Sequence, residues 1–368
     1  MNERQRLLIN RDQLDDVQWH SEALPSPADG QVLLAIDNFA LTANNITYAA
    51  FGDALQYWEF FPAPVGSGIV PVWGFADVVA SNCDGIEVGE RFYGFYPLAS
   101  HLLVEPAQVS DTSFTDNAEH RRSLPVIYNQ YLRTSSDALY DADREAVQML
   151  LRPLFTTSFL LDDFFADQAM FGARELHLTS ASSKTAIGMA FCLQHNRANR
   201  DADYAIVGLT SARNKAFVES LDCYDRVVTY DEAATLGNQT PSAIVDFAGD
   251  GTLLRTLHEQ LGDSLRYSCL VGASHWDQRA GAGPDMPGPD PVMFFAPHQA
   301  EKRISEWGGE RFAQHLADQW QAFCEFAGGW MEIDASEGRE AIAQTYQQVL
   351  AGNFSPRSGY VLSKFSCQ

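Results

Sequence analysis

The chain is poor in positive charge, and in lysine above all. Its 368 residues include 25 lysines and arginines against 48 aspartates and glutamates, so the net charge is −23 at pH 7. A chain this acidic argues against nucleic acids and anionic membranes as partners. Lysine occurs only at Lys184, Lys215, Lys302 and Lys364, so each lysine is informative about where an anion would bind.

Cysteine and long apolar runs are also scarce. The six cysteines are scattered and contain no C-x-x-C pair, which argues against a structural zinc site and a disulfide framework. No apolar run approaches the roughly 18 residues of a membrane span, and the N-terminus has no apolar signal core. These absences predict a cytoplasmic protein with reduced thiols and no bound metal.

Short apolar or alternating runs, separated by glycine and proline turns, fill the first hundred residues. Such a pattern is typical of a compact β domain with few helices. The predicted strands span residues 32–42, 74–81, 91–97 and 100–109.

A long polar stretch follows over residues 111–143. Connections of this length are usually functional or disordered, and the aromatic residues here favour an ordered insert. A helix pattern then covers residues 144–167, and Pro153 is the place where it would break.

From residue 175 the pattern changes to alternating strands and helices. Continuous apolar strands with crossover helices predict an α/β fold with a doubly wound parallel sheet covered on both faces. The remainder from residue 301 is mainly helical and ends in a strand pattern at 358–365. The predicted strands span 175–180, 204–209, 226–230, 242–248, 267–273 and 292–296, and the predicted helices span 185–195, 212–221 and 252–261.

A turn of small residues, Ser180 to Thr185, joins the first of these strands to a helix. A strand, a tight turn and a helix start together point backbone N–H groups at an anion. The turn also supplies hydroxyls and one cation from Ser182, Ser183, Lys184 and Thr185.

Two better-known lysine motifs do not fit this turn. A nucleotide P-loop needs glycines one and six positions before Lys184, and neither residue is glycine. A serine–lysine acyl-transfer site needs a serine three positions before the lysine, where Ala181 stands. A dinucleotide pyrophosphate site fits the surrounding strand–helix units, although the usual glycines are absent. The alternative is that Ser180 or Ser182 simply caps a buried helix.

The second strand of this region also ends in a polar turn. An NAD site usually carries an acidic residue there for the ribose 2′-hydroxyl. This turn instead has Ser211, Arg213 and Lys215, which suit a 2′-phosphate and favour NADP(H). The alternative is a helix start that faces solvent.

Several segments together resemble the medium-chain dehydrogenase/reductase superfamily, in its zinc-independent, quinone-oxidoreductase-like branch. They are GQVLLAIDNFALTANNITYAAFGD (30–53), GIEVGERFYGFYPLASHLLVEP (85–106), YDRVVTYDE (224–232), AIVDFAGDG (243–251) and the C-terminal VLAGNFSPRSGYVLSKF (349–365). The family's A-x-G-G-V-G turn is replaced by S-A-S-S-K-T-A. With LLRPLF (150–155) and FFAP (294–297), this turn is similar to that of an uncharacterised branch.

The resemblance implies a GroES-like β-rich domain over residues 1–143, with the insert 111–143, and a Rossmann NADP(H)-binding domain over 144–300. Residues 301–368 would return to the first domain. It further implies an NADPH-dependent oxidoreductase without zinc that transfers hydride to an enone, quinone or carbonyl compound. A non-catalytic NADP(H)-binding redox sensor or scaffold is the alternative. The expected partners are a small-molecule substrate and, in a homodimer, a second copy of the chain.

Without zinc, another group must stabilise or protonate the oxyanion that develops on the substrate. Tyr48 is the candidate, with Asn44 or Asn45 as polarising donors, and the alternative for Tyr48 is a core aromatic. The resemblance places Thr157 and Ser158 beside the nicotinamide. Further cofactor contacts are expected at Gly249, Gly272 and Phe295.

Overall fold

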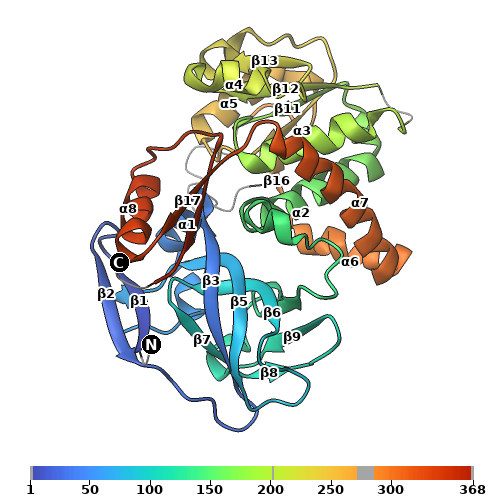
Figure 1. Cartoon of the computed structure of the whole chain (residues 1–368). Coiled ribbons are helices and arrows are strands. Elements are labelled where there is room, and N and C mark those ends of the chain that lie inside the picture. Colours follow the sequence, from blue (N-terminus) through green and yellow to red (C-terminus); the bar gives the residue numbers. More distant parts are fainter. Residues whose placement is uncertain (1–2, 201–202, 272–285, 366–368) are drawn as a thin grey trace. The chain divides into compact units, whose positions relative to one another are not determined.

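The computed structural model describes residues 3–200, 203–271 and 286–365, and the chain divides into two compact units (Figure 1). Unit 1 comprises Met1–Leu150 and Met331–Gln368, and unit 2 comprises Leu151–Trp330. Unit 1 is therefore assembled from two separated segments, whereas unit 2 is one continuous stretch. The boundary falls inside helix α2 (Glu145–Asp167), seven residues later than the predicted boundary at residue 143.

Unit 1 is built from two β-sheets. The larger sheet has the order β17-β18-β3-β5-β6-β10-β9-β8, with β7 also paired to β3, and the smaller one has the order β2-β1-β4. The strands of the larger sheet are β3 (Val32–Leu41), β5 (Pro71–Ser81), β6 (Arg91–Pro97), β7 (His101–Val104), β8 (Pro106–Ala107), β9 (Ser113–Asp116), β10 (Gln130–Arg133), β17 (Glu332–Glu337) and β18 (Ser358–Ser363). The smaller sheet contains β1 (Glu3–Asn10), β2 (Val17–Ala23) and β4 (Ser67–Gly68).

Short helices complete unit 1. They are α1 (Ala43–Ala50), α8 (Arg339–Leu350) and the 3-10 turns η1 (Tyr57–Glu59), η2 (Glu119–Arg121), η3 (Val126–Tyr128) and η4 (Ala142–Arg144). The core lies against the central strands β3, β5 and β6, whose apolar residues are buried on both faces. Gly74 permits the close approach of β5 to β3, because a Cβ atom there would lie 2.4 Å from the carbonyl oxygen of Asn38.

The insert 111–143 is part of the larger sheet. Strand β10 pairs with β6, and β9 pairs with β10. Between them, the buried guanidinium of Arg121 donates to Asp116 (2.9 Å), Asn129 (2.8 Å) and the Tyr131 hydroxyl (2.9 Å). A fourth hydrogen bond, 2.6 Å long, reaches the carbonyl oxygen of Tyr128. The insert is thus an ordered extension of the sheet.

Unit 2 contains a six-stranded parallel sheet with the order β13-β12-β11-β14-β15-β16. Numbered along the chain, this is the 3-2-1-4-5-6 order of a doubly wound fold, with its topological switch between β11 and β14. The strands are β11 (Glu175–Leu178), β12 (Ala205–Thr210), β13 (Arg226–Thr229), β14 (Ser242–Asp246), β15 (Leu265–Leu270) and β16 (Val292–Met293). The helices include α3 (Lys184–Arg197), α4 (Lys215–Glu219), α5 (Gly251–Leu261), α6 (Ala296–Trp307) and α7 (Gly309–Gly328), with 3-10 turns η5 (Ala169–Gly172), η6 (Ala212–Asn214), η7 (Tyr230–Thr235) and η8 (Gly262–Ser264).

Helix α2 is not broken at Pro153, which lies inside it. Proline removes one intrahelical hydrogen bond, but the helix buries a long apolar face that continues through this position. The packing of Leu150, Leu151 and Phe155 therefore outweighs the local cost.

The predicted return to the first domain at residue 301 comes too early. Helices α6 and α7 belong to unit 2, and the return begins at Met331. Phe323 of α7 stacks on Phe155 of α2 with ring centroids 4.5 Å apart. Arg303 of α6 binds Asp163 of α2 at 2.7 Å. The apolar face of a helix shows that the helix packs against another element, but the sequence does not show which unit contains that element.

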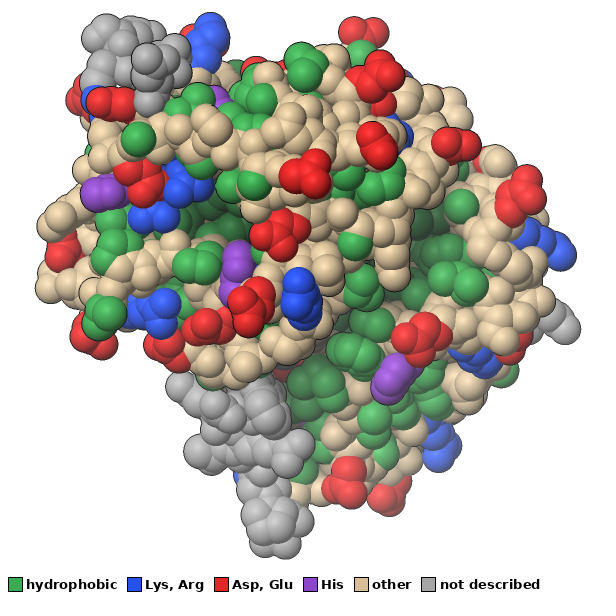
Figure 2. Space-filling view, turned by 90° about the horizontal axis from the view of Figure 1, so that it is seen from below, with side chains coloured by type: hydrophobic (Ala, Val, Ile, Leu, Met, Phe, Trp, Pro, Cys, Tyr) green, Lys and Arg blue, Asp and Glu red, His purple; other side chains and the backbone are tan. Residues whose placement is uncertain are grey.

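Acidic side chains are spread over the face of the molecule seen in Figure 2. The negative charge on this face is therefore dispersed over many positions. No helix among the described residues is both long and apolar enough to cross a membrane.

Candidate functional site

The carboxyl edge of the parallel sheet is the candidate site. In doubly wound sheets, ligands bind outside the carboxyl ends of the strands, at the topological switch. Here the turns that follow β11, β12 and β14 all lie at this edge, because these strands are parallel neighbours. The predicted cofactor residues from Ser182 to Lys215 fall in the first two of these turns.

Hydrogen bonds to serine side chains stabilise the turn after β11. Ser180 has a left-handed backbone with φ of +49°, a conformation usually left to glycine. The hydroxyl of Ser182 accepts hydrogen bonds from Asn214 (3.0 Å) and Thr210 (3.4 Å), and so ties this turn to the next one. Ser183 caps α3, since its Oγ accepts from the backbone N–H of Ala186. A serine therefore caps this helix, but it is Ser183 and not Ser180 or Ser182 as expected.

Lys184 is the first residue of α3. Burial lowers the pKa of its amine to about 8, because the charged form is poorly solvated there. An anion next to this amine would stabilise the charged form, and the helix N-terminus would attract the same anion. Lys184 is thus well placed for the predicted pyrophosphate.

Ser158 has a structural partner at the same turn. Its buried hydroxyl lies 2.8 Å from the backbone oxygen of Thr185 and 3.0 Å from that of Leu154. Helix α3 approaches α2 closely here, since a Cβ atom on Gly188 would lie 2.6 Å from the Ser158 Oγ. Ser158 therefore fixes the start of α3 against α2. The neighbouring Thr157 is half-buried, and its contact with a cofactor stays a prediction.

The turn after β12 differs because its polar groups are not all satisfied. The Oγ of Ser211 is buried and has no hydrogen-bond partner in the described part of the chain. Arg213 is exposed and makes no ion pair within residues 3–200, 203–271 and 286–365. Lys215 lies 3.2 Å from Glu232. An unsatisfied buried hydroxyl costs about 1–3 kcal/mol, which a ligand oxygen would offset, so this turn fits a 2′-phosphate.

Two residues at the switch point were not found from the sequence. The buried hydroxyl of Thr179 donates to the Asp246 carboxyl at 2.6 Å and accepts from the backbone N–H groups of Phe247 and Ala248. Burial raises the pKa of Asp246. This pair joins the ends of β11 and β14 and shapes the loop that contains Gly249, whose φ is +67°. The sequence signal that could have identified this pair is a polar residue at the end of an apolar strand.

Two further residues near the site, Tyr230 and Glu232 after β13, were not predicted from the sequence. Tyr230 is half-buried; burial raises its pKa, and its hydrogen bonds with Ser180 oppose that rise. Glu232 accepts from the backbone N–H and the hydroxyl of Thr229, at 2.9 and 3.0 Å. Glu232 follows β13 and not β12, where an acidic residue is expected, and only the pairing of the two strands brings its carboxylate to Lys215.

The predicted catalytic residues lie on α1 in unit 1. Tyr48 is only 4% exposed, and its hydroxyl accepts a 2.7 Å hydrogen bond from Asn44. Burial raises the pKa of this phenol far above 10, so it stays protonated. Tyr48 also packs on Tyr57 with ring centroids 4.4 Å apart. Both the catalytic and the core-aromatic interpretations of Tyr48 are compatible with these contacts.

Asn45 has a structural role. Its carbonyl oxygen accepts from the backbone N–H of Thr42 at 2.7 Å, and its amide donates to the carbonyl of Pro71 at 2.8 Å. Both ends of this buried side chain are therefore used to start α1 and tie it to β5. This leaves Tyr48 and Asn44 as the candidates on α1.

The remaining predicted contacts are Phe295 and Gly272. Phe295 is the N-cap residue of α6; it is 55% exposed and packs edge-on against His298. Gly272 lies outside the described residues.

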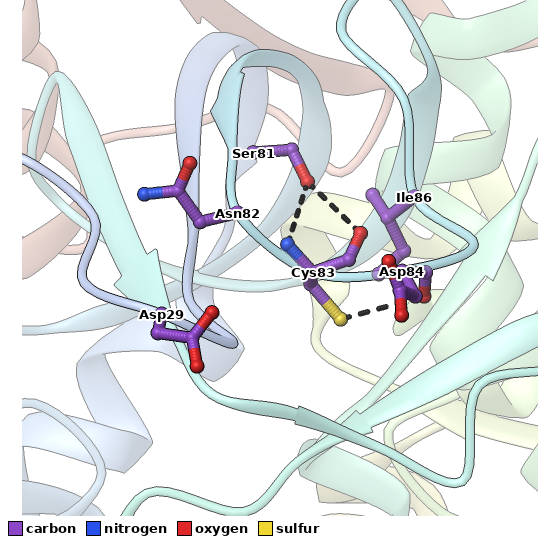
Figure 3. A pocket seen from close by; sticks show the side chains of 6 residues that line it. All are labelled: Asp29, Ser81, Asn82, Cys83, Asp84 and Ile86. Atoms are coloured by element: carbon purple, nitrogen blue, oxygen red, sulfur yellow. Dashed lines mark hydrogen bonds between the residues drawn. The ribbon is translucent and has the colours of Figure 1, made fainter.

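A separate hollow of about 390 Å³ opens in unit 1 (Figure 3). Two carboxylates but no basic side chain line it, and burial together with Asp84 raises the pKa of the Cys83 thiol, which lowers its reactivity. Its lining residues are Asp29, Ser81, Asn82, Cys83, Asp84 and Ile86. Among the described residues, no group of three or more His, Cys, Asp or Glu side chains is arranged to hold a metal ion.

Comparison with solved structures identifies similar folds over the whole chain. CurA from Vibrio vulnificus in complex with NADPH is 13% identical, with 99% of this chain and 100% of that chain covered and a TM-score of 0.59. The quinone oxidoreductase from Coxiella burnetii is 13% identical, with coverages of 98% and 99% and a TM-score of 0.53. A mutant form of enoyl thioester reductase from Candida tropicalis is 11% identical, with coverages of 99% and 100% and a TM-score of 0.55. The predicted α/β fold, with a GroES-like β-rich part and a Rossmann part, is confirmed.

Sequence comparisons are less specific. No curated protein matches the chain. The family described as "Protein of unknown function (DUF2855)" matches residues 39–355.

Proposed function

The chain belongs to the DUF2855 family of proteins of unknown function, and we propose that it is an NADP(H)-dependent oxidoreductase that works without zinc. One observation carries the proposal. At the carboxyl edge of a 3-2-1-4-5-6 parallel sheet, the turn after β12 contains Ser211, whose buried hydroxyl has no partner among the described residues, and the exposed Arg213. The similar folds include a protein in complex with NADPH, a quinone oxidoreductase and an enoyl thioester reductase, which supports the proposal.

The cofactor would be held by two turns with different tasks. The N-terminus of α3 and the amine of Lys184 would bind the pyrophosphate, with Ser182 keeping the two turns in register. Ser211 and Arg213 would bind the 2′-phosphate, which makes NADPH the preferred cofactor.

The bound cofactor would supply a hydride to an enone, a quinone or a carbonyl compound. The acceptor then needs a proton on the atom that becomes negatively charged. Tyr48 is proposed as the donor, because Asn44 holds its hydroxyl oxygen in place and the phenol is protonated at neutral pH. Burial raises its pKa and so weakens it as an acid, but an alkoxide or enolate is basic enough to take its proton. The resulting phenolate would regain its proton from water, so that one hydride and one proton are added to the acceptor.

Calorimetric titration with NADPH and NADH tests the binding half of this proposal. We expect Arg213→Ala to weaken NADPH binding by about tenfold or more, and NADH binding much less, because a charged hydrogen bond contributes about 1.5–3 kcal/mol. Arg226→Ala is the matched control: it is another exposed arginine of this sheet, but it begins β13 and pairs with Glu175. Equal NADPH affinity in the Arg213 and Arg226 variants would remove the cofactor assignment.

Consumption of NADPH in the presence of enones, quinones and aldehydes tests the catalytic half. Tyr48→Phe should lower turnover by at least tenfold with unchanged NADPH affinity, because only the proton donor is lost. An unaltered rate would dismiss the role of Tyr48. Tight NADPH binding without consumption by any acceptor would instead favour a redox sensor or scaffold.

A further inference from the structure

The turns after β12 and β13 lie side by side at the carboxyl edge of the sheet. The two strands are parallel, and Thr210 at the end of one lies opposite Thr229 at the end of the other. Glu232 follows Thr229 by three residues, and its carboxylate reaches the amine of Lys215 at 3.2 Å. A negative charge is thus placed next to a cation of the turn assigned to the 2′-phosphate.

This carboxylate is held in position independently of Lys215. The backbone N–H and the hydroxyl of Thr229 both donate to it, at 2.9 and 3.0 Å, in a capping box that starts η7. These hydrogen bonds, followed by the ion pair with Lys215, lower the pKa of Glu232, so it is ionised at neutral pH. Binding of a ligand to Lys215 would therefore leave a fixed anion nearby.

The pair is not a buried structural element. The side chains of Lys215 and Glu232 are 33% and 50% exposed, and ion pairs this accessible contribute little to stability. An incoming phosphate would meet both groups directly. It would compete with Glu232 for Lys215 and would be repelled by the carboxylate.

We infer that Glu232 sets the cofactor selectivity of the site by penalising the 2′-phosphate of NADPH. The same carboxylate could accept a hydrogen bond from the 2′-hydroxyl of NADH. The chain would then bind both cofactors, with a smaller preference for NADPH than Ser211 and Arg213 alone would give. This inference rests on the proposed function.

The test compares NADPH and NADH affinities of the wild-type protein and of Glu232→Gln by calorimetry. Glutamine keeps the capping box and removes only the charge, and an unchanged thermal midpoint will confirm that the fold is intact. Two unit charges a few ångströms apart in water change a binding constant by about fivefold, so the ratio of NADPH to NADH affinity should rise about fivefold to tenfold. Asp231→Asn removes an equal charge from the neighbouring exposed residue and should change the ratio less than about twofold.

The outcomes separate the inference from the proposed function. A ratio in Glu232→Gln equal to that of the wild type, with both cofactors bound, would overturn the inference alone. An equal rise in Asp231→Asn would also overturn it, because the effect would then belong to net charge. Failure of the wild type and Glu232→Gln to bind either cofactor would overturn the proposed function and the inference together.

Discussion

Two polar clusters of the molecule, one around Arg121 in unit 1 and one around Ser211 in unit 2, differ in how completely their hydrogen bonds are satisfied. Arg121 is 1% exposed, and each nitrogen of its guanidinium has an oxygen partner. The Ser211 hydroxyl is buried without a partner in the described chain, and the nearby Arg213 faces solvent.

This difference separates structure from recognition. A buried charge with all its partners rigidifies the fold around it, and in the insert Arg121 ties the end of β9 to β10 and the turn before it. An unsatisfied buried group lowers the stability of the fold and has a free position for a ligand atom. Three experiments test whether the satisfied cluster stabilises the fold and the unsatisfied one binds a ligand.

The largest effect is expected in the satisfied cluster. Arg121→Met should lower the free energy of unfolding by about 3–5 kcal/mol, because Asp116 would remain buried as an uncompensated charge. Chemical denaturation measures this loss. Arg122→Met is the control, since the Arg122 side chain is exposed and donates to the carbonyl of Asn117, so its loss should change the free energy of unfolding by less than about 0.5 kcal/mol. Equal stability of the two variants would contradict the structural role of the cluster.

A smaller effect is expected at Lys184. Its amine is buried, as the guanidinium of Arg121 is, but it belongs to the proposed cofactor site, as Ser211 does. Its pKa is lowered to about 8, so the amine is charged below this pH and loses its charge above it. NADPH affinity should therefore fall between pH 7 and pH 9, by roughly 1.5 kcal/mol if the charged hydrogen bond is lost. Calorimetry across this range measures the change, and Lys184→Met should bind weakly with a flat profile. A flat profile in the wild type would exclude Lys184 from the phosphate site.

The smallest effect is expected at Ser211. Ser211→Ala should not lower the free energy of unfolding, since the buried hydroxyl that it removes makes no hydrogen bond within the described residues. The same variant should weaken NADPH binding by about 1 kcal/mol. Ser220→Ala, at the end of α4, is the comparison: it removes a hydroxyl that donates to Phe217 and should not affect the cofactor. A large loss of stability in Ser211→Ala would mean that its hydroxyl is structurally satisfied after all.

The parallel sheet was predictable because its strands are continuous apolar runs that end at polar turns. Each predicted strand of unit 2 overlaps the observed one, and α3 begins one residue before its predicted start. Strands that bury little gave no such signal. Strand β17 has the sequence EIDASE and is largely exposed, so only its pairing with β18 keeps it extended.

Side-chain roles were predictable only where local chemistry decides them. The cations after β12 could be found because lysine is rare and an acidic residue is missing from that turn. The structural use of Asn45 depends on Pro71, and the position of Glu232 beside Lys215 depends on the register of β12 and β13. Contacts of this kind join residues far apart in the sequence, and periodicity does not encode them.

The pairing of β3 with β18 has a consequence for biosynthesis. Leu41 lies opposite Tyr360, so this part of the larger sheet closes only after the chain has been synthesised through β18. Unit 2 is continuous and can fold on the ribosome while that partner strand is still missing. Until then residues 38–41 of β3 lack this partner strand, although β7 can already pair with residues 32–35, and the open edge is a site for misassociation with other nascent chains. We expect this slow long-range pairing to be the step of maturation most dependent on chaperones.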